Sequence, residues 1–295
     1  MHTSRTCSGS SQRRKPVAWT SGGSQSGRVD EIEMFVRDGF VRVAGAFGED
    51  VAADCRTVLW EDVRRQVPSL DPEDPATWTE PVVRLGDHGE EPFRLAAGSP
   101  RLTEAIDALV GPGRWRPRES LGSTPVRFPS ERSAGDDGWH VEGSFRADAG
   151  EFDYFRWRVN LASKDRALLM LFLFSEVGDD DAPTRLRVGS HRPVARLLAP
   201  YGEGGEEMLP LSLRAAKATA DLPVTLATGR PGDVYLCHPF LVHAAQRHQG
   251  SRPRFMAQPG VLPSDPFDVE NGTSPVEVAI REALAEKTAR TGQRK

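Results

Sequence analysis

The chain has 295 residues and a formal net charge of −4; 38% of its residues are hydrophobic and 27% are charged. This balance is ordinary for a folded globular protein, and the charge gives no reason to expect nucleic acid as a partner. The longest apolar run, residues 167–174, is far shorter than the roughly 20 residues that cross a bilayer, so no membrane association is expected. A chain of this length commonly forms one large domain.

Three cysteines, Cys7, Cys55 and Cys237, are too few and too widely spaced for a disulfide framework or a zinc cluster. We therefore expect a reducing, cytoplasmic location. Residues 1–28 contain no Asp or Glu, many Ser and Gly, and no apolar face. This composition predicts a disordered tail rather than a transit peptide, followed by a single folded domain over residues 29–295.

The first part of that domain, residues 29–121, is expected to be mostly helical. Apolar residues at helical spacing predict a short helix that closes at Gly39, and a strand follows it. A second helix is predicted over residues 49–66. Ser99-Pro100 is a typical helix start, with a cap before a proline in the first turn, and Gly111-Pro112 ends that helix.

From about Gly122 the pattern changes to short strand-like runs separated by Gly, Pro, Asp and Asn. The predicted strands are 124–128, 157–161, 168–174, 184–188, 223–226, 233–236, 241–245 and 254–258. Many short strands with turn signals between them are typical of an antiparallel sandwich or barrel. We therefore expect a mainly β fold with flanking helices. It would have a double-stranded β-helix (jelly-roll, cupin-like) core over residues 122–262 and a C-terminal helical segment over 263–295, where Ser274 and Glu277 form a capping box.

His140 and Glu142 are the most informative residues of the chain, because they lie two positions apart in an extended stretch. Side chains two apart on a strand point the same way, so this imidazole and carboxylate can hold one face of a divalent metal. A third ligand must come from elsewhere, and His243 is a candidate. Two histidines and one carboxylate, with other coordination positions open, are the ligand set of non-haem Fe(II) oxygenases.

Two further segments carry candidate site residues. In residues 232–243 a turn leads into a strand that delivers His243 into the β core, and a later strand bears Arg254 eleven positions further on. Residues 183–191 contain Thr184 and end in Gly-Ser-His at His191.

In this order, the His-x-Glu pair, the Gly-Ser-His segment and the distal histidine with a following arginine resemble the phytanoyl-CoA dioxygenase family of Fe(II)- and 2-oxoglutarate-dependent oxygenases. The resemblance covers roughly residues 123–261. It implies that His140, Glu142 and His243 are the catalytic residues that bind Fe(II), and that Arg254 binds the distal carboxylate of 2-oxoglutarate. It also implies that dioxygen is consumed while 2-oxoglutarate is converted to succinate and CO₂. A guanidinium suits the second role, because its planar fork of donors matches a carboxylate.

The sequence departs from the family pattern in one place, where Glu142 stands instead of the usual aspartate. The glutamate side chain is one methylene longer, so its backbone must lie further from the metal. An acid at this position also argues against a halogenase, which needs a small residue there.

Several alternatives stay open at individual positions. Arg252 competes with Arg254 for 2-oxoglutarate, and we favour Arg254 because Arg252 precedes a proline and belongs to the turn. Thr184 either contacts 2-oxoglutarate or is an ordinary strand residue. His238 and His248 are rival third metal ligands, although His238 lies on the other face of its strand.

The expected function is hydroxylation of a small organic molecule. One alternative is a cupin-like protein that binds a metal or ligand without turnover, which Glu142 would favour. Another is a cupin-type metalloenzyme that does not use 2-oxoglutarate, which an Arg254 outside the pocket would favour. We expect substrate contacts from residues 71–78, 146–155 and 200–220, whose aromatic and arginine side chains do not select one substrate.

Overall fold

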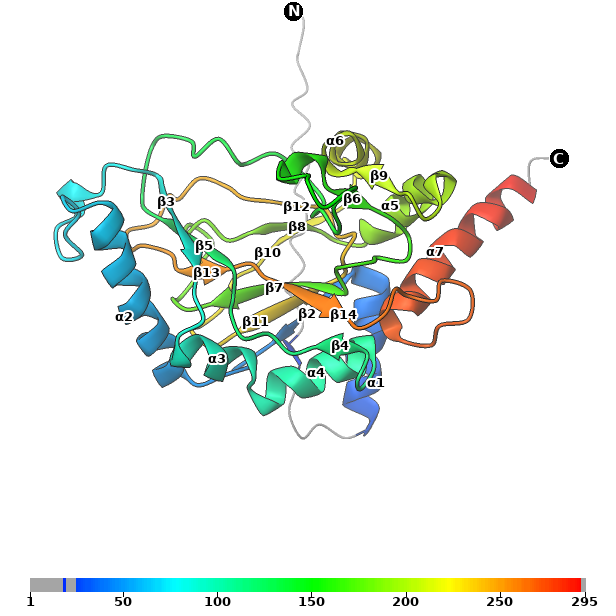
Figure 1. The fold of residues 1–295 in the computed structure, drawn as a ribbon, viewed down its shortest axis with the longest axis horizontal. Coiled ribbons are helices and arrows are strands. Elements are labelled where there is room, and N and C mark those ends of the chain that lie inside the picture. The colour runs from blue at the N-terminus through cyan, green and yellow to red at the C-terminus, as the bar shows by residue number, and fades with distance from the viewer. Residues whose placement is uncertain (1–17, 20–24, 293–295) are drawn as a thin grey trace, which may run out of the picture.

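The structure, a computed structural model, describes residues 18–19 and 25–292. Its strands form one sheet of seven strands, one of three, and two separate two-stranded ribbons. Helices surround these strands (Figure 1). Among the described residues, no helix is both long and apolar enough to cross a membrane.

The larger sheet consists of β1 (Ala18–Trp19), β2 (Phe40–Val43), β4 (Trp115–Arg116), β7 (Leu168–Leu173), β11 (Val234–Cys237), β13 (Met256–Ala257) and β14 (Gly260–Pro263). Its order is β1-β2-β11-β7-β14-β4, and β13 also pairs with β7. At its centre, β11 runs antiparallel to both β2 and β7.

The smaller sheet has the order β10-β8-β12, in which β8 (Arg185–Arg187) pairs antiparallel with β10 (Val224–Leu226) and with β12 (His243–Ala244). One ribbon joins β3 (Val82–Asp87) to β5 (Ser123–Arg127), and the other joins β6 (Arg158–Val159) to β9 (Glu206–Glu207). In Figure 1 the smaller sheet lies above the larger one.

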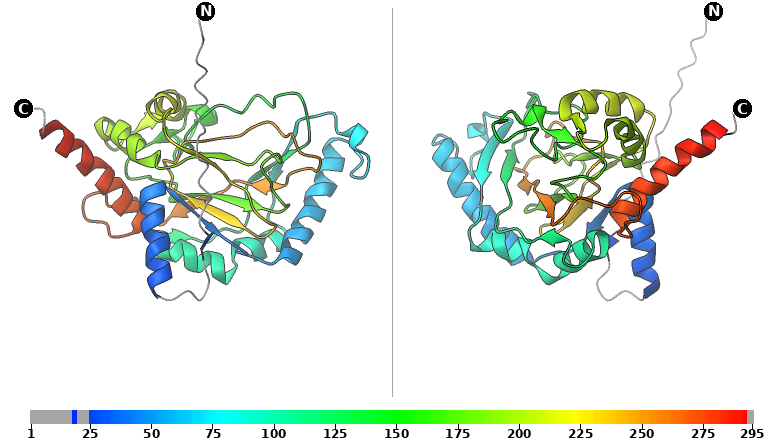
Figure 2. Two further views of the ribbon diagram at one scale, coloured as in Figure 1. Left: turned by 180° about the vertical axis from the view of Figure 1, so that it is seen from behind. Right: turned by 45° about the vertical axis from the view of Figure 1, so that its right-hand side comes forward.

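The helices are α1 (Gln25–Asp38), α2 (Glu49–Gln66), α3 (Glu91–Ala97), α4 (Pro100–Val110), α5 (His191–Leu198), α6 (Met208–Ala218) and α7 (Pro275–Gly292). Three single-turn helices, η1 (Pro75–Thr77), η2 (Tyr154–Arg156) and η3 (Ala199–Tyr201), lie in the connections. The strands occupy the centre, with α2, α3 and α4 on one side and α6 on the other (Figure 2).

Strand β7 is buried on both faces, as its unbroken apolar run predicts. Its odd-numbered leucines share a cluster with Leu186 of the smaller sheet. Its even-numbered residues share a second cluster with Leu59 of α2 and Leu102 of α4. Because strand side chains alternate, the larger sheet lies between the helices and the smaller sheet. The inter-sheet space, defined here by the cluster that contains Leu186, is where the site residues meet.

Strong local end signals predicted the helix limits correctly. The bounds of α2 and α4 match the predicted ranges, and the Leu102 N–H donates to the Ser99 hydroxyl over 3.3 Å. The capping box of α7 is confirmed, since the Ser274 N–H donates to Oε2 of Glu277 over 3.0 Å. No helix was predicted at the positions of α3, α5 and α6.

The tail predicted over residues 1–28 lies mostly outside the described residues. Within that range the structure has β1, which pairs with β2, and the start of α1 at Gln25. Gly39 closes α1 with a φ of +86°, a conformation that favours glycine.

Candidate metal centre and anion site

His140 and His243 face each other across an antiparallel bridge. The His140 N–H donates to the His243 carbonyl over 2.9 Å, and the His243 N–H donates to the His140 carbonyl over 3.0 Å. Directly opposed residues project their side chains to the same side, and the two ring centroids lie 4.3 Å apart. On β12, His243 is also paired with Leu186, which packs between the two sheets. The His243 ring therefore points into the inter-sheet space, with His140 beside it.

Glu142 adds a third group to this pair. Its Oε1 lies 3.3 Å from Nε2 of His243 and 3.7 Å from Nε2 of His140. One ligand atom from each of the three residues lies within 4.8 Å of the others. The structure thus brings together the three residues that the sequence analysis assigned to the metal.

The opposite nitrogens of both rings are held by backbone carbonyls. Nδ1 of His140 lies 2.9 Å from the Gly138 carbonyl, and Nδ1 of His243 lies 3.0 Å from the Leu241 carbonyl. A proton at Nδ1 that is shared with a carbonyl leaves Nε2 as the basic nitrogen. Both rings are therefore oriented to present Nε2 to a metal, as ligating histidines are.

The three groups also set one another's protonation. Burial raises the pKa of the Glu142 carboxyl, but hydrogen bonds from His140 and His243 outweigh this and hold that pKa well below its usual range. Burial, and then the charge of His140, lowers the pKa of His243. Burial lowers the pKa of His140. The hydrogen bond to Glu142 and the charge of Glu142 raise this pKa by more than burial lowers it, so it lies above its ordinary value. An ionised carboxylate and a neutral imidazole are the forms that bind a cation.

The second oxygen of Glu142 is held by the protein itself. The Tyr154 O–H donates to Oε2, and Nη2 of Arg166 lies 3.9 Å from the same atom. Gly143 ties both residues in place: its N–H donates to the Tyr154 hydroxyl over 3.1 Å, and its carbonyl accepts from Nε of Arg166 over 3.0 Å. Oε2 is therefore engaged, and Oε1 is the oxygen turned to the histidines. Tyr154 lies in residues 146–155, which were expected to contact substrate, and no local motif marks it or Arg166 as a partner of Glu142.

Arg254 approaches the inter-sheet space from the larger sheet. Met256 packs there with Leu186, and strand alternation places Arg254 on the same face. The Arg254 side chain is buried; Nη1 donates to the Ala182 carbonyl over 2.6 Å and Nη2 to the Pro125 carbonyl over 3.4 Å. Its Nε has no partner among the described residues.

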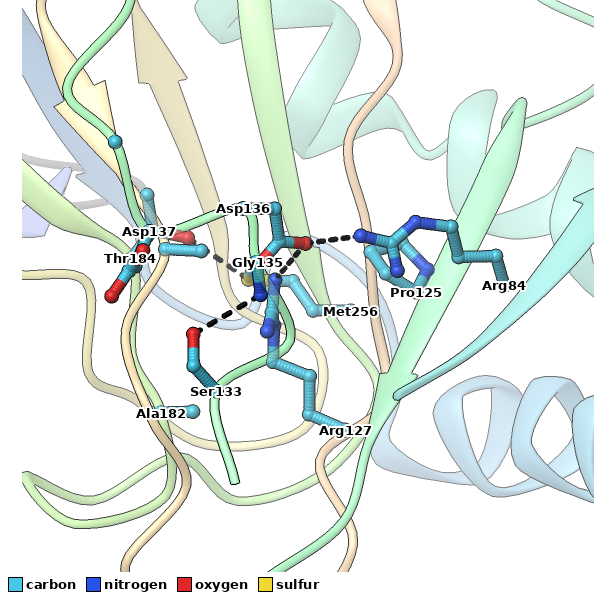
Figure 3. Close-up of polar contacts among 12 residues, drawn as sticks. Arg84, Pro125, Arg127, Ser133, Gly135, Asp136, Asp137, Ala182, Thr184 and Met256 are labelled. Carbon is cyan, nitrogen blue, oxygen red and sulfur yellow. Dashed lines mark hydrogen bonds and ion pairs between the residues drawn. The ribbon is translucent and has the colours of Figure 1, made fainter. Parts of the chain in front are cut away.

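A second buried arginine, Arg127, lies beside Arg254, and the two residues form an antiparallel bridge. Asp136 is engaged elsewhere, since its Oδ2 accepts from Arg127 over 2.7 Å and from Arg84 over 2.5 Å (Figure 3). Burial, and then the charge of Arg127, lowers the pKa of Arg254 well below its ordinary value. A buried guanidinium with only carbonyl partners is unfavourable, so this position suits an anionic ligand. No local motif in the sequence marks Arg127 or Asp136 as a partner of this site.

The two other cofactor candidates lie in different surroundings. Thr184 is buried, and its hydroxyl lies 4.0 Å from Sδ of Met256 on the inner face (Figure 3). The Arg252 side chain is 76% exposed and lies 3.6 Å from Glu176. The structure therefore places Thr184 inside the protein, as it does Arg254, and leaves Arg252 at the surface.

The remaining candidate histidines are structural. His191 and His238 pack with ring centroids 4.8 Å apart, and their Nε2 atoms lie 3.0 Å from the Val36 carbonyl and 3.4 Å from the Val276 carbonyl. Burial lowers the pKa of His191 to about 4, so its ring is neutral. Nδ1 of His248 accepts from the Gly250 N–H over 3.1 Å. Neither rival third ligand joins the metal-ligand group found among the described residues.

No family model matches the chain, and no curated protein matches it. Solved structures do share its fold. HygX from Streptomyces hygroscopicus, with nickel, 2-oxoglutarate and hygromycin B bound, is 19% identical with a TM-score of 0.50, covering 80% of this chain and 87% of HygX. The epimerase SnoN, in complex with Fe3+, alpha ketoglutarate and nogalamycin RO, is 17% identical with a TM-score of 0.55, covering 82% and 85%. AviO1 from Streptomyces viridochromogenes Tue57 is 17% identical with a TM-score of 0.51, covering 83% and 98%. The similarity establishes a common fold, and membership of the phytanoyl-CoA dioxygenase family stays a prediction.

Proposed function

We propose that this protein is an Fe(II)- and 2-oxoglutarate-dependent oxygenase that hydroxylates a small organic molecule and releases succinate and CO₂. One observation carries the proposal. The ligand atoms of His140, Glu142 and His243 converge. The buried Arg254, whose hydrogen-bond partners among the described residues are backbone carbonyls, lies on the inner face of the opposite sheet. We further propose that residues 29–295 form one domain with a jelly-roll core. Two stacked sheets support this, and their strand pairs are antiparallel except for β1 with β2.

The three converging groups fit Fe(II) by their chemistry. Two imidazole nitrogens and one carboxylate oxygen on one side of a metal leave its other positions open for a chelating cosubstrate and dioxygen. The carbonyl contacts at Gly138 and Leu241 keep the rings in the binding orientation, so little rearrangement would accompany loading.

The surroundings of Arg254 fit 2-oxoglutarate. Its guanidinium offers a planar fork to the distal carboxylate, and the Thr184 hydroxyl lies on the same inner face to donate a further hydrogen bond. Bound together, the metal and the 2-oxo acid would supply the oxidising chemistry. The protein contributes their positions.

The proteins that share the fold support the same cofactors and a small-molecule substrate. HygX holds nickel, 2-oxoglutarate and hygromycin B, and SnoN holds Fe3+, alpha ketoglutarate and nogalamycin RO. Because SnoN is an epimerase, the shared fold does not by itself select hydroxylation. We propose hydroxylation on the basis of the resemblance to the phytanoyl-CoA dioxygenases.

The first test is formation of the metal chelate. Purified protein mixed anaerobically with Fe(II) and 2-oxoglutarate should develop a weak visible charge-transfer band. Iron binding without this band would remove 2-oxoglutarate from the proposal and favour another cupin-type metalloenzyme. A normal band would favour a binding protein that does not turn over if no succinate forms, either with or without candidate substrates.

Three variants locate the binding groups. Glu142→Ala should greatly weaken iron retention, because only two ligands remain. Arg254→Ala should retain iron but require at least tenfold more 2-oxoglutarate to form the band, since charge-assisted hydrogen bonds are lost. Arg252→Ala is the matched control and should behave like the unaltered protein, because that side chain is exposed. A larger effect at Arg252 than at Arg254 would contradict the assignment.

A further inference from the structure

A cavity of about 680 Å³ lies near the candidate metal centre, although none of the three candidate ligands lines it. Its wall includes Arg166, whose Nη2 lies 3.9 Å from Oε2 of Glu142. Gln258 also lines it, four residues beyond Arg254 on the same strand face, which is roughly 13 Å of extended chain. The cavity therefore adjoins the inter-sheet space at the end that is remote from Arg254, where a substrate rather than 2-oxoglutarate would bind.

The lining of this cavity is predominantly cationic. Four arginines line it against two aspartates: Arg116, Arg118, Arg146 and Arg166, with Asp148 and Asp165. Among the described residues, no ion pair joins these arginines to these aspartates. Arg118 instead donates to the carbonyls of Ser120 and Gly260 over 2.8 and 3.0 Å. Even with Glu142 counted as a partner of Arg166, positive charge remains in excess.

The same wall has hydrogen-bond donors without acceptors. Nη1 of Arg166 and Nε1 of Trp157 are both shielded from solvent, and neither has a partner among the described residues. Shielded donors that lack acceptors are unfavourable. Acceptor oxygens of a ligand, reached by a small adjustment of these side chains, would remove that deficit.

Aromatic side chains give the cavity a second chemical character. The Cζ of Arg146 lies 5.1 Å from the Trp157 ring centroid and 5.7 Å from that of Phe152. Phe145 also lines the cavity, and Phe152, which is 82% exposed, lies against Arg146 of the cavity wall. A ligand with an apolar body and an anionic group would match both the rings and the guanidinium groups.

We propose that this cavity binds the carboxylate or phosphate group of the substrate, so that the enzyme acts on an organic anion with an apolar body. The assignment of this ligand as substrate rests on the proposed oxygenase function. The binding of an anion in the cavity does not, because Arg118 and Arg146 need no metal to bind it.

The test measures binding of three matched aromatic probes to the metal-free full-length protein by calorimetry or ligand-observed NMR. Benzoate or phenyl phosphate should bind at least tenfold more tightly than neutral benzamide, and the preferred anion identifies the group. The double variant Arg118→Gln/Arg146→Gln should weaken anion binding at least tenfold. Arg252→Gln, an exposed arginine outside this cavity, should leave it unchanged. Arg146→Gln alone serves if loss of the Arg118 carbonyl contacts impairs folding.

Arg254→Gln separates this cavity from the 2-oxoglutarate site. Arg254→Gln should leave probe binding unchanged. If Arg254→Gln abolishes probe binding while the double variant does not, the anions occupy the 2-oxoglutarate site and the proposal is wrong. Equal binding of benzamide, or no binding of either anion at millimolar concentration, would also overturn it. If the protein binds the anions specifically but forms no Fe(II)–2-oxoglutarate chelate, the proposed oxygenase function is wrong and the proposed anion site is supported.

Discussion

At the scale of single residues, Glu142 divides its two oxygens between different partners. Oε1 faces the histidines, whereas Oε2 accepts from Tyr154 and lies near Arg166. A glutamate has one more rotatable bond than an aspartate and so loses more conformational entropy when it is fixed. Tyr154 and Arg166 reduce that freedom before any metal binds. This arrangement explains how the longer acid can occupy a position where the resembled family usually has aspartate.

Tyr154→Phe is therefore expected to weaken metal binding although Tyr154 is not itself a ligand. Because this hydrogen bond is already formed without metal, its loss weakens binding only by the cost of ordering Glu142, about 1 kcal/mol, so the dissociation constant for Ni(II) or Mn(II) should rise roughly fivefold. Calorimetric titration measures the change. Tyr201→Phe is the control, because Tyr201 stacks on Arg214 and is partly exposed. Equal affinities for Tyr154→Phe and the unaltered protein would show that Glu142 needs no such anchor.

At the scale of elements, Glu277 joins the start of α7 to two distant segments. Its carboxylate accepts from the Ser274 N–H and, over 2.9 Å, from the Asp268 N–H. It also forms a two-pronged pair with Arg114, at 2.8 and 2.5 Å. Burial alone would raise the pKa of Glu277, but the bonds from Arg114 and Ser274 lower it to about 2. The capping box seen in the sequence thus also fixes α7 to the loop after α4.

The low pKa of Glu277 predicts a pH-dependent contribution to stability. A carboxyl with a folded pKa below its unfolded value of 4.5 stabilises the fold above pH 4.5, and this contribution is lost as the pH falls towards 2. The difference corresponds to at most about 3 kcal/mol. Glu277→Gln should therefore lower the free energy of unfolding by about 2–3 kcal/mol at pH 7 and by clearly less at pH 3. Denaturant unfolding at both pH values tests this, with the half-exposed Glu282→Gln on the same helix as control. A pH-independent loss would rule out ionisation as the cause.

Elements with strong local signals could be predicted from the sequence, and the others could not. Helices α2 and α4 were predictable because caps and prolines mark their ends. Helix α6 was missed because the exposed Leu209 and Leu213 interrupt its apolar stripe. Strands β3, β4 and β14 were also missed.

The same distinction applies to the site. The spacing of His140 and Glu142 is a local signal. Pro253 is another, because the residue before a proline favours a turn, which distinguishes Arg252 from Arg254 on the following strand. Tyr154, Arg166 and the cavity wall are brought to Glu142 only by tertiary packing. Such long-range contacts cannot be inferred from a single sequence.

At the scale of the whole molecule, the two halves of the proposed site belong to opposite sheets. His243 lies on β12 of the smaller sheet, and His140 is bridged to it. Arg254 precedes β13 of the larger sheet, and its Nη1 reaches the Ala182 carbonyl near the start of β8. A metal and 2-oxoglutarate bound together would therefore connect the two sheets. Each ligand alone would contact mainly one of them.

This arrangement predicts that the two ligands stabilise the fold cooperatively. A ligand at a hundred times its dissociation constant adds about 2.7 kcal/mol, which for a domain of this size raises the Tm by roughly 5 °C. Thermal unfolding with Ni(II), which avoids oxidation, with 2-oxoglutarate, and with both should give a combined shift larger than the sum of the single shifts. In Arg254→Ala the rise in Tm caused by Ni(II) should persist, but the combined shift should no longer exceed the sum of the single shifts. In Glu142→Ala the rise caused by Ni(II) and the excess over the sum should both be lost. Additive shifts in the unaltered protein would mean that the ligands bind independently, and that the two sheets do not share one site.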